Sequence, residues 1–157
     1  KVSKSMRKIL RNEEFSFTEN QCFEEVMRNC AEIKRNGQDS TWISEEMIKA
    51  YVKLNQLRKA KSIEVWKDGR LVGGFYGGRN KEGREEWNVF CGESMFSKVS
   101  NASKAGFLHF VLNNQDHYQL IDCQVYSEHL ESLGAREIPK KDFLSILSEG
   151  EKRYLSE

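Results

Sequence analysis

An acid and an amide, Asp122 and Gln124, lie two positions apart in the otherwise apolar segment of residues 120–125. In a β-strand they would share one face, roughly 7 Å apart, and Cys123 would point to the other face. One interpretation is a hydrogen-bonded pair that only stabilises the fold. The other is a catalytic pair, in which the carboxylate accepts a proton or orients an amine and the amide positions a carbonyl. The residues by themselves leave both interpretations open.

Glu93 is an anion among apolar neighbours, and it either caps a turn or belongs to a site. Strand alternation turns Cys123 away from the polar pair, which disfavours a cysteine nucleophile. The three histidines show no H-E-x-x-H spacing, and the four cysteines form no C-x-x-C pair. We therefore expect no metal site, and we expect the reduced thiols of a cytosolic protein.

Composition limits the class of protein. The chain of 157 residues is 38% hydrophobic and 11% aromatic, which predicts one globular domain. No stretch approaches about 18 consecutive apolar residues, so we expect no membrane span. The formal net charge of +1 argues against binding a polyanion through bulk charge. Basic residues instead gather at 1–11, 58–61 and 136–141, which form either solvated faces or a discontinuous phosphate-contacting surface.

Two helices are expected first. Residues 18–21 have the form of a capping box, which would open a helix that Gly37 ends. Ser44, followed by two glutamates, predicts the start of a second helix. The buried stripe of this second helix would consist of Met47, Ile48, Tyr51, Leu54 and Leu57.

The spacing of apolar residues then changes to a period of 2, which predicts strands. Strands at 61–67 and 71–78 would be joined by a turn at Asp68-Gly69. The glycines of the second strand indicate a bulge or the close approach of a ligand. A third strand is expected at 87–91, an irregular segment at 92–100, a helix from about residue 101 and a fourth strand at 120–125. A short helix ended by Gly134 and a last helix from Asp142 to Leu147 complete the expected order.

The expected fold class is therefore α+β: a mixed, mostly antiparallel sheet flanked by helices, with one parallel crossover. This order resembles the GNAT acyltransferase fold. GNAT enzymes hold the pyrophosphate of acyl-CoA with a Q/R-x-x-G-x-G/A turn between a central strand and the next helix, because bare backbone donors must reach the phosphate. Residues 92–100, at the corresponding place, lack such a glycine pair, so we do not expect CoA.

Several motifs resemble the family of leucyl/phenylalanyl-tRNA–protein transferases. They follow the family's order across essentially the whole chain: SKSMR at 3–7, TWI at 41–43, SIEVW at 62–66, LVGG at 71–74, CGESMFS at 91–97, NASK at 101–104, LIDCQV at 120–125 and LGAREIP at 133–139. The resemblance implies a single GNAT-like catalytic domain over residues 1–157. It also implies that the family's N-terminal domain is missing upstream.

By resemblance, the enzyme would move Leu or Phe from aminoacyl-tRNA to the N-terminal α-amine of proteins that begin with Arg or Lys, which marks them for degradation. Asp122 and Gln124 would be the catalytic pair. Because the tRNA ester is already activated, the reaction needs no cofactor, ATP or metal. The attacking amine has an unperturbed pKa of roughly 7.7–8.0, so positioning would carry most of the rate. We expect a cytoplasmic monomer that does not contact membranes.

The resemblance also implies substrate-binding residues. Trp42 would stack on the terminal adenosine, and Gly92 and Glu93 would line the same site as the catalytic pair. The pocket for the transferred side chain would be made by Phe75, Phe90, Met95, Phe107 and Phe110. The chain departs from the family at Asn114, where an apolar residue is expected, and at Ser127, where Asn is expected. These departures concern the depth of the pocket and the contacts to the acceptor.

Two other functions remain open. One is a catalytically silent module that binds aminoacyl-RNA or a protein N-terminus, and the other is an ordinary N-acetyltransferase. Product formation with aminoacyl-tRNA separates an active transferase from the silent module. Binding of acetyl-CoA would favour the acetyltransferase.

Overall fold

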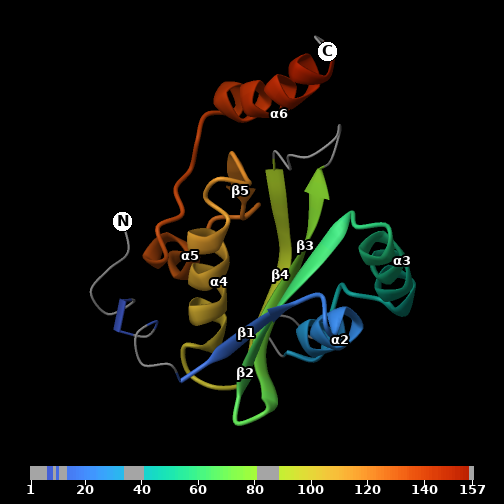
Figure 1. The fold of residues 1–157 in the computed structure, drawn as a ribbon, viewed down its shortest axis with the longest axis vertical. Helices are drawn as coiled ribbons and strands as arrows, with labels where there is room; N and C mark the ends of the chain where they lie inside the picture. The colour runs from blue at the N-terminus through green and yellow to red at the C-terminus, as the bar shows by residue number, and fades with distance from the viewer. Residues whose placement is uncertain (1–6, 9, 11–13, 34–40, 81–88, 156–157) are drawn as a thin grey trace.

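The computed structural model describes residues 7–8, 10, 14–33, 41–80 and 89–155. Figure 1 shows how the chain is arranged in space. Its helices and strands are, in order, β1 (Ser16–Glu19), α2 (Phe23–Glu32), α3 (Glu45–Gln56), β2 (Ala60–Lys67), β3 (Arg70–Asn80), β4 (Val89–Ser97), α4 (Ala102–Asn113), β5 (Leu120–Asp122), α5 (Glu128–Ser132) and α6 (Lys140–Leu155).

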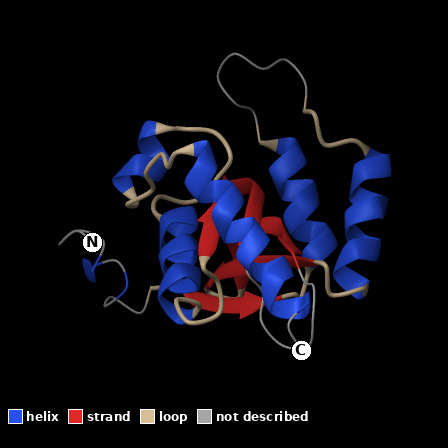
Figure 2. Ribbon diagram, turned by 90° about the horizontal axis from the view of Figure 1, so that it is seen from above, coloured by secondary structure: helices blue, strands red, loops and turns tan. Residues whose placement is uncertain are grey.

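The strands form one sheet with the order β1-β2-β3-β4-β5. Neighbouring strands are antiparallel except β4 and β5, which are parallel. Helices α2 and α3 pack on one face and α4 packs on the other, so the sheet lies between two helical layers (Figures 1 and 2). A parallel neighbour requires a crossover, and α4 supplies it. The expected meander, crossover helix and parallel strand are therefore present.

The turn between β2 and β3 lies at Asp68-Gly69, as the sequence predicted. Both residues have positive φ, 50° and 72° respectively, which is the conformation that tight hairpin turns require and that Asp and Gly tolerate. In β2, residues on both faces are buried, because helices cover both sides of the sheet. The strand predicted at 61–67 is present, and its polar residues Lys61, Ser62 and Glu64 are buried as well as Ile63 and Val65.

The capping box predicted at residues 18–21 does not form. Thr18 lies in β1, where its hydroxyl donates to the Glu64 carboxylate over 2.6 Å and accepts from the indole N–H of Trp66 over 2.8 Å. Because Glu64 is fully buried, it needs such donors, and the contact between strands outweighs local capping. Helix α2 begins after Cys22 without a side-chain cap. The predicted helix end at Gly37 lies outside the described residues.

Helix α3 begins as predicted. The Ser44 hydroxyl accepts a hydrogen bond from the backbone N–H of Met47, which satisfies one of the donors at the helix start. Of the expected buried stripe, Ile48 is buried and three residues are half-buried. Leu57 follows the last helical residue and is 59% exposed, so it does not belong to the stripe.

Strand β4 is longer than the sequence indicated. It continues to Ser97, whereas residues 92–100 were expected to be irregular. The segment itself lacks a strand pattern, but β3 provides a hydrogen-bonded partner along its whole length. Trp87, in the predicted third strand, lies outside the described residues. The last helix begins at Lys140, two residues before the predicted cap at Asp142, and reaches Leu155.

Helix α4 approaches the sheet very closely. A Cβ at Gly73 of β3 would lie 2.8 Å from the Cβ of Ala102, and one at Gly106 of α4 would lie 2.5 Å from Cγ2 of Val65. The bulge predicted for β3 is present at Val72, which has no partner in β2 because Val65 pairs with Gly73 and Trp66 with Leu71. Gly73 of β3 therefore lies beside a bulge and allows helix packing in the described structure.

Two large hydrophobic clusters lie on opposite faces of the sheet. The cluster under α2 and α3 includes the fully buried Met27 and Tyr76. The cluster under α4 is mainly aromatic and includes the fully buried Phe90 and Phe110. Most of the sheet is covered by these clusters, whereas residues 91–95 of β4, next to the edge strand β5, are only half-buried.

We predict that Gly73→Ala destabilises the protein by about 1–3 kcal/mol, because the new methyl group would push α4 away from the sheet. The matched control is Gly78→Ala in the same strand, where a Cβ would meet no atom within 4 Å. The control should change stability by at most about 0.5 kcal/mol. Urea unfolding followed by circular dichroism measures both, and equal midpoints for the two variants would show that the contact with Ala102 is not limiting.

Candidate active site

The parallel pairing of β4 and β5 places the predicted catalytic segment. Phe90 pairs with Ile121 and Cys91 pairs with Asp122. β5 has 3 residues and forms one edge of the sheet. Asp122 is its last residue and is half-buried. The carboxylate therefore stands where the sheet ends, beside a neighbouring strand and open to solvent on one side.

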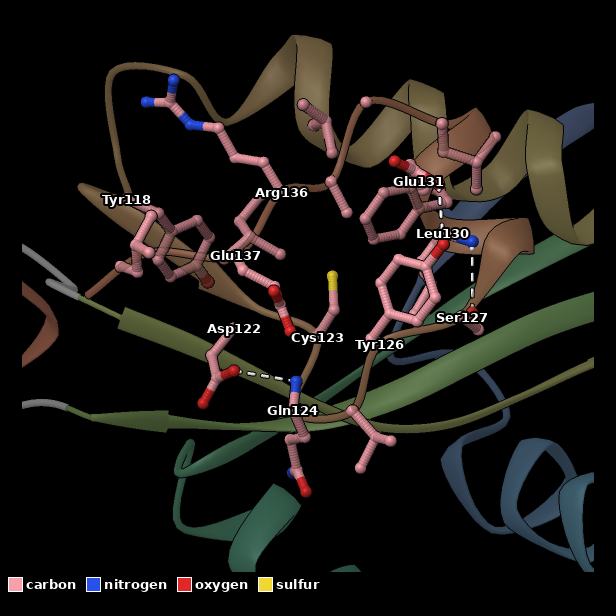
Figure 3. A pocket seen from close by; sticks show the side chains of 18 of the residues that line it. Tyr118, Asp122, Cys123, Gln124, Tyr126, Ser127, Leu130, Glu131, Arg136 and Glu137 are labelled. Atoms are coloured by element: carbon pink, nitrogen blue, oxygen red, sulfur yellow. Dashed lines mark hydrogen bonds between the residues drawn. The ribbon is translucent and has the colours of Figure 1, made fainter. Parts of the chain in front are cut away.

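Gln124 does not lie in a strand, which corrects the expectation for residues 120–125. Its φ is +62°, in the left-handed region. The N–H of Val125 donates to the carbonyl of Cys123 over 2.8 Å, which closes a tight three-residue turn around Gln124. The N–H of Gln124 donates to Oδ1 of Asp122 over 2.8 Å (Figure 3). The pair is thus brought together by a hydrogen-bonded turn and not by a shared strand face.

Glu93 is the extra residue of a β-bulge. Tyr76 pairs with Ser94 and Gly77 with Gly92, so Glu93 has no opposite residue in β3. Bulges redirect side chains and are frequent next to active sites. Gly92 lies beside the edge strand β5, since a Cβ there would lie 3.5 Å from the carbonyl oxygen of Asp122.

Burial and nearby carboxylates raise the pKa values of two thiols in the site. Burial raises the pKa of Cys91, and the charges of Asp122 and Glu93 raise it further. Burial and the charge of Asp122 also raise the pKa of Cys123. A nucleophilic thiol needs a lowered pKa, so these directions agree with the expectation that cysteine does not attack. They also show that both carboxylates lie near Cys91.

Tyr51 of α3 is a site neighbour that sequence reasoning missed. Burial, followed by the charge of Glu93 and a hydrogen bond to it, raises the pKa of Tyr51 to about 12. The ring of Tyr51 packs edge-on against Tyr76, with 5.4 Å between ring centroids. The sequence placed Tyr51 in an apolar stripe. The available signal was its hydroxyl, because a half-buried tyrosine hydroxyl needs a polar partner.

The predicted side-chain pocket is a packed aromatic cluster. The centroid of Phe110 lies 5.5 Å from that of Phe75 and 4.7 Å from that of Phe90. Phe107 joins the cluster through Phe75 at 5.9 Å, and Met95 packs against it. The structure therefore brings all five residues together. Of the five, Phe107 lines open space.

That space is a cleft of about 1180 Å³ beside β5. It lies between the end of α4, the turn after β5, α5 and the segment that leads to α6 (Figure 3). Residues that line it include Phe107, Asp122, Gln124, Tyr126, Glu131 and Glu137. Tyr126, Glu131 and Glu137 were not singled out in the sequence as site residues. The sequence gave no sign that these three residues belong to one site, because they come from three different segments.

Trp42 lies apart from this cleft. It is 44% exposed and precedes the start of α3. The far end of α3 leads into Ala60, which pairs with Gly78 at the level of the sheet where Cys91 and Asp122 meet. Trp42 and Arg58 therefore flank opposite ends of α3, and Trp42 does not line the cleft.

Two further expectations are modified. Lys61 was assigned to a basic surface, but its side chain is 10% exposed and forms a 2.6 Å ion pair with Glu19. It is therefore not available to contact phosphate in this conformation. Asn114, the expected departure from the family, is buried and its amide donates to the carbonyl of Phe110 over 2.8 Å, so it caps the end of α4.

Other kinds of site receive no support from the described residues. Within them, no group of three or more His, Cys, Asp or Glu side chains is arranged to hold a metal ion. No helix in the described part of the chain is long and apolar enough to span a membrane. The four cysteines all lie in that part, and no disulfide joins them.

Comparison with known sequences identifies related proteins. A family model described as leucyl/phenylalanyl-tRNA protein transferase matches residues 1–148. Proteins with this name from Flavobacterium johnsoniae and Flavobacterium psychrophilum are 56% and 50% identical, each over 93% of this chain. One from Syntrophobacter fumaroxidans is 46% identical over 95%. The chain spans 66%, 67% and 62% of these relatives, about two thirds of their length. These matches confirm the resemblance found in the motifs.

Comparison with solved structures identifies the fold. A possible acetyltransferase from Clostridium difficile superposes with a TM-score of 0.57 at 12% identity, covering 81% of this chain and 93% of that one. A ribosomal-protein-alanine N-acetyltransferase from Brucella melitensis gives 0.52 at 11%, covering 80% and 95%. The expected GNAT-like α+β fold is confirmed.

The turn before α4 does not fit the pyrophosphate of CoA. The N–H of Ser103 donates to the Ser97 hydroxyl over 3.2 Å, and the N–H of Ala102 donates to the Val99 carbonyl over 3.3 Å. Two of the backbone donors at the start of α4 are therefore used within the protein. In addition, Ala102 packs closely against Gly73, so the start of α4 cannot move nearer to the sheet.

We predict that Gln124→Gly is more stable than Gln124→Ala by about 1 kcal/mol, because every residue except glycine bears a steric cost at positive φ. The alanine variant is the matched control, since both substitutions remove the same polar group. Thermal unfolding measures the difference. An alanine variant that equals or exceeds the glycine variant in stability would contradict the left-handed turn.

Proposed function

Because the chain belongs to the leucyl/phenylalanyl-tRNA protein transferase family, we propose that it transfers Leu or Phe from aminoacyl-tRNA to the N-terminal α-amine of proteins that begin with Arg or Lys. The transfer marks those proteins for degradation. Residues 1–157 act as one GNAT-like catalytic domain in a cytoplasmic monomer. The observation that carries the proposal is the Asp122–Gln124 turn at the mouth of the cleft.

Asp122 and Gln124 have separate roles in this proposal. Oδ1 of Asp122 is occupied by the Gln124 N–H, and no described residue donates to Oδ2. Oδ2 therefore orients the incoming amine and accepts its proton. The side-chain amide of Gln124 donates to the ester carbonyl as negative charge develops on that oxygen. The backbone hydrogen bond holds the two groups in a fixed relation before substrate arrives, which is the requirement for positioning catalysis.

The reaction is balanced without a further reagent. The amine nitrogen forms a bond to the ester carbonyl carbon, and the bond from that carbon to the ribose oxygen breaks. The proton released by the amine ends on the ribose oxygen, and Asp122 relays it. The energy comes from the ester, which is less stable than the amide that replaces it.

Glu93 and Tyr51 stabilise the second side of the site. Glu93 is the extra residue of a bulge, and its charge raises the pKa of the neighbouring Tyr51 hydroxyl. Gly92, between Glu93 and Cys91, lies beside Asp122, because a Cβ there would be in van der Waals contact with the Asp122 carbonyl oxygen. In the proposal Glu93 receives polar groups of the aminoacyl end, and Tyr51 holds its carboxylate in place.

The transferred side chain enters at the edge of the aromatic cluster. Phe107 is 7% exposed and lines the cleft, whereas Phe90 and Phe110 are fully buried. Met95, Phe75, Phe90 and Phe110 form the wall behind Phe107. Trp42 stacks on the terminal adenosine, and the exposed Arg58 and Lys59 contact tRNA phosphates without reading bases.

The proposal predicts transfer of radiolabelled Leu from tRNA to a peptide that begins with Arg, and it predicts different losses for two variants. Asp122→Ala removes the charge and the acceptor for Gln124, so transfer should fall by about 10²-fold or more. Asp122→Asn keeps an Oδ1 acceptor but loses the charge. It should remain at least about tenfold below wild type if the carboxylate handles the amine.

The matched control is Asp116→Ala, an exposed acid that does not line the cleft. Its transfer rate should equal that of wild type. Full activity in Asp122→Asn would reduce Asp122 to a residue that only holds the turn. Absence of transfer by the wild type, with intact aminoacyl-tRNA binding, would indicate the silent binding module. Labelling from acetyl-CoA in its place would indicate an acetyltransferase.

A second prediction concerns the choice of amino acid. A wall at Phe107 suits a side chain that is unbranched at Cβ, so Leu, Phe and Met should exceed Ile and Val by tens to hundreds of fold, roughly 1–3 kcal/mol per methyl group. Competition among the five aminoacyl-tRNAs for one peptide measures this. Phe107→Ala should narrow the difference, whereas Leu112→Ala, which is exposed on α4, should not. Equal use of Ile and Leu by wild type would mean that Phe107 is only a core residue.

A further inference from the structure

The cleft has an acidic wall that the reaction chemistry does not use. The Tyr126 hydroxyl donates to Oε2 of Glu131 over 2.8 Å. The pKa of Tyr126 is raised by this hydrogen bond and by the charge of Glu131, and further by the charge of Glu137. Glu131 and Glu137 therefore lie close to the same hydroxyl, although they come from α5 and from the segment before α6. Together with Asp122 they give the cleft three carboxylates.

Glu137 differs from Glu131 in having no described partner. Glu131 is engaged by Tyr126, but no described residue forms a hydrogen bond or an ion pair with Glu137. Figure 3 shows the Glu137 side chain directed down to β5, where Asp122 and Cys123 lie. The neighbouring Arg136 also lines the cleft, but its side chain extends away from Asp122. Of these two neighbours, it is therefore the Glu137 carboxylate that points to the Asp122 end of the cleft.

Apolar side chains form the rest of the rim. Val125 and Tyr126 line the cleft, and they are 76% and 58% exposed. A partner that covered them would remove exposed apolar surface from water. The volume of about 1180 Å³ exceeds what a single amino-acid side chain needs. The cleft therefore suits a short segment of polypeptide with a cation at one end.

We propose that this cleft binds the N-terminal segment of the acceptor protein and that Glu137 binds the cationic side chain of its first residue. The inference rests on the proposed function, because it places the acceptor's amine at Asp122. The Arg or Lys head group meets Glu137, and the following residues cover Val125 and Tyr126. Glu137 is thus a specificity-determining residue for the acceptor.

Charge complementarity favours this occupant over RNA. The acceptor's first residue carries one positive charge on its side chain, and its α-amine is partly protonated near neutral pH. The cleft is lined by three carboxylates and two cations, Arg136 and Lys140, so its lining carries a net negative charge. The carboxylates, gathered near Asp122 and Tyr126, attract these groups and repel the phosphates of a nucleic acid. The assignment also keeps the two substrates apart, since the tRNA approaches from the side of Arg58 and Lys59.

The test compares a peptide that begins with Arg and one that begins with citrulline, which has nearly the same shape but no charge. Each carries a fluorophore at its C-terminal end, so anisotropy gives its affinity for the full chain, and transfer from Leu-tRNA gives kcat/KM. Wild type should prefer Arg to citrulline by about tenfold or more, as expected for one charge-assisted hydrogen bond. Glu137→Gln should reduce that preference to below about twofold.

The matched control is Glu128→Gln, an exposed acid of α5 that does not line the cleft. It should keep the wild-type preference. An unchanged Arg-to-citrulline ratio in Glu137→Gln would overturn the proposal, as would competition for the peptide by deacylated tRNA, which would make the cleft an RNA site. If wild type fails to transfer Leu, the proposed function fails, and the anisotropy ratio still decides the role of Glu137.

Discussion

The close contact between α4 and the sheet is the constraint on which the site depends. Gly73 and Gly106 allow this contact, because a methyl group at either position would overlap Ala102 or Val65. A crossover helix pressed against β2 and β3 must return the chain to the edge of β4, so β5 pairs there in parallel. The register of that pairing puts Asp122 beside Cys91. A shift of one residue would turn Asp122 into the aromatic cluster, where a lone carboxylate cannot be solvated.

The same constraint supports the strained turn at Gln124. A residue with a side chain at positive φ costs about 1–2 kcal/mol, and one hydrogen bond from its N–H to Asp122 contributes about 1 kcal/mol. The hydrogen bond alone therefore does not fully offset the strain of the turn. The deficit is offset by the packing of Ile121 and Cys123 against the aromatic cluster, which holds both sides of the turn. Strain at this position is consistent with the general finding that functional sites keep unfavourable backbone conformations.

Local chemistry could be predicted from the sequence, whereas contacts between distant segments could not. Asp68-Gly69 and Ser44 act within four residues of themselves, and both behave as predicted. Thr18 fails because its partner Glu64 is 46 residues away. In the site, Asp122, Gln124 and Glu93 were found, but their geometry was not, because a bulge and a left-handed turn leave no periodic signal. Tyr51, Tyr126 and Glu137 were missed for the reason that affects Thr18: each acquires its role from another element.

The state of the aromatic cluster decides how an amino acid can be recognised. Phe90 and Phe110 are fully buried, and their rings lie 4.7 Å apart. To separate them would leave a cavity, and cavities in aromatic cores cost several kcal/mol, about as much as burial of a Leu side chain returns. Deep insertion therefore gives little net affinity. Contact at Phe107, on the edge of the cluster, avoids that cost and still covers apolar surface. Recognition at the edge senses branching near the backbone more than it senses length, because the atoms closest to the ester meet the wall first.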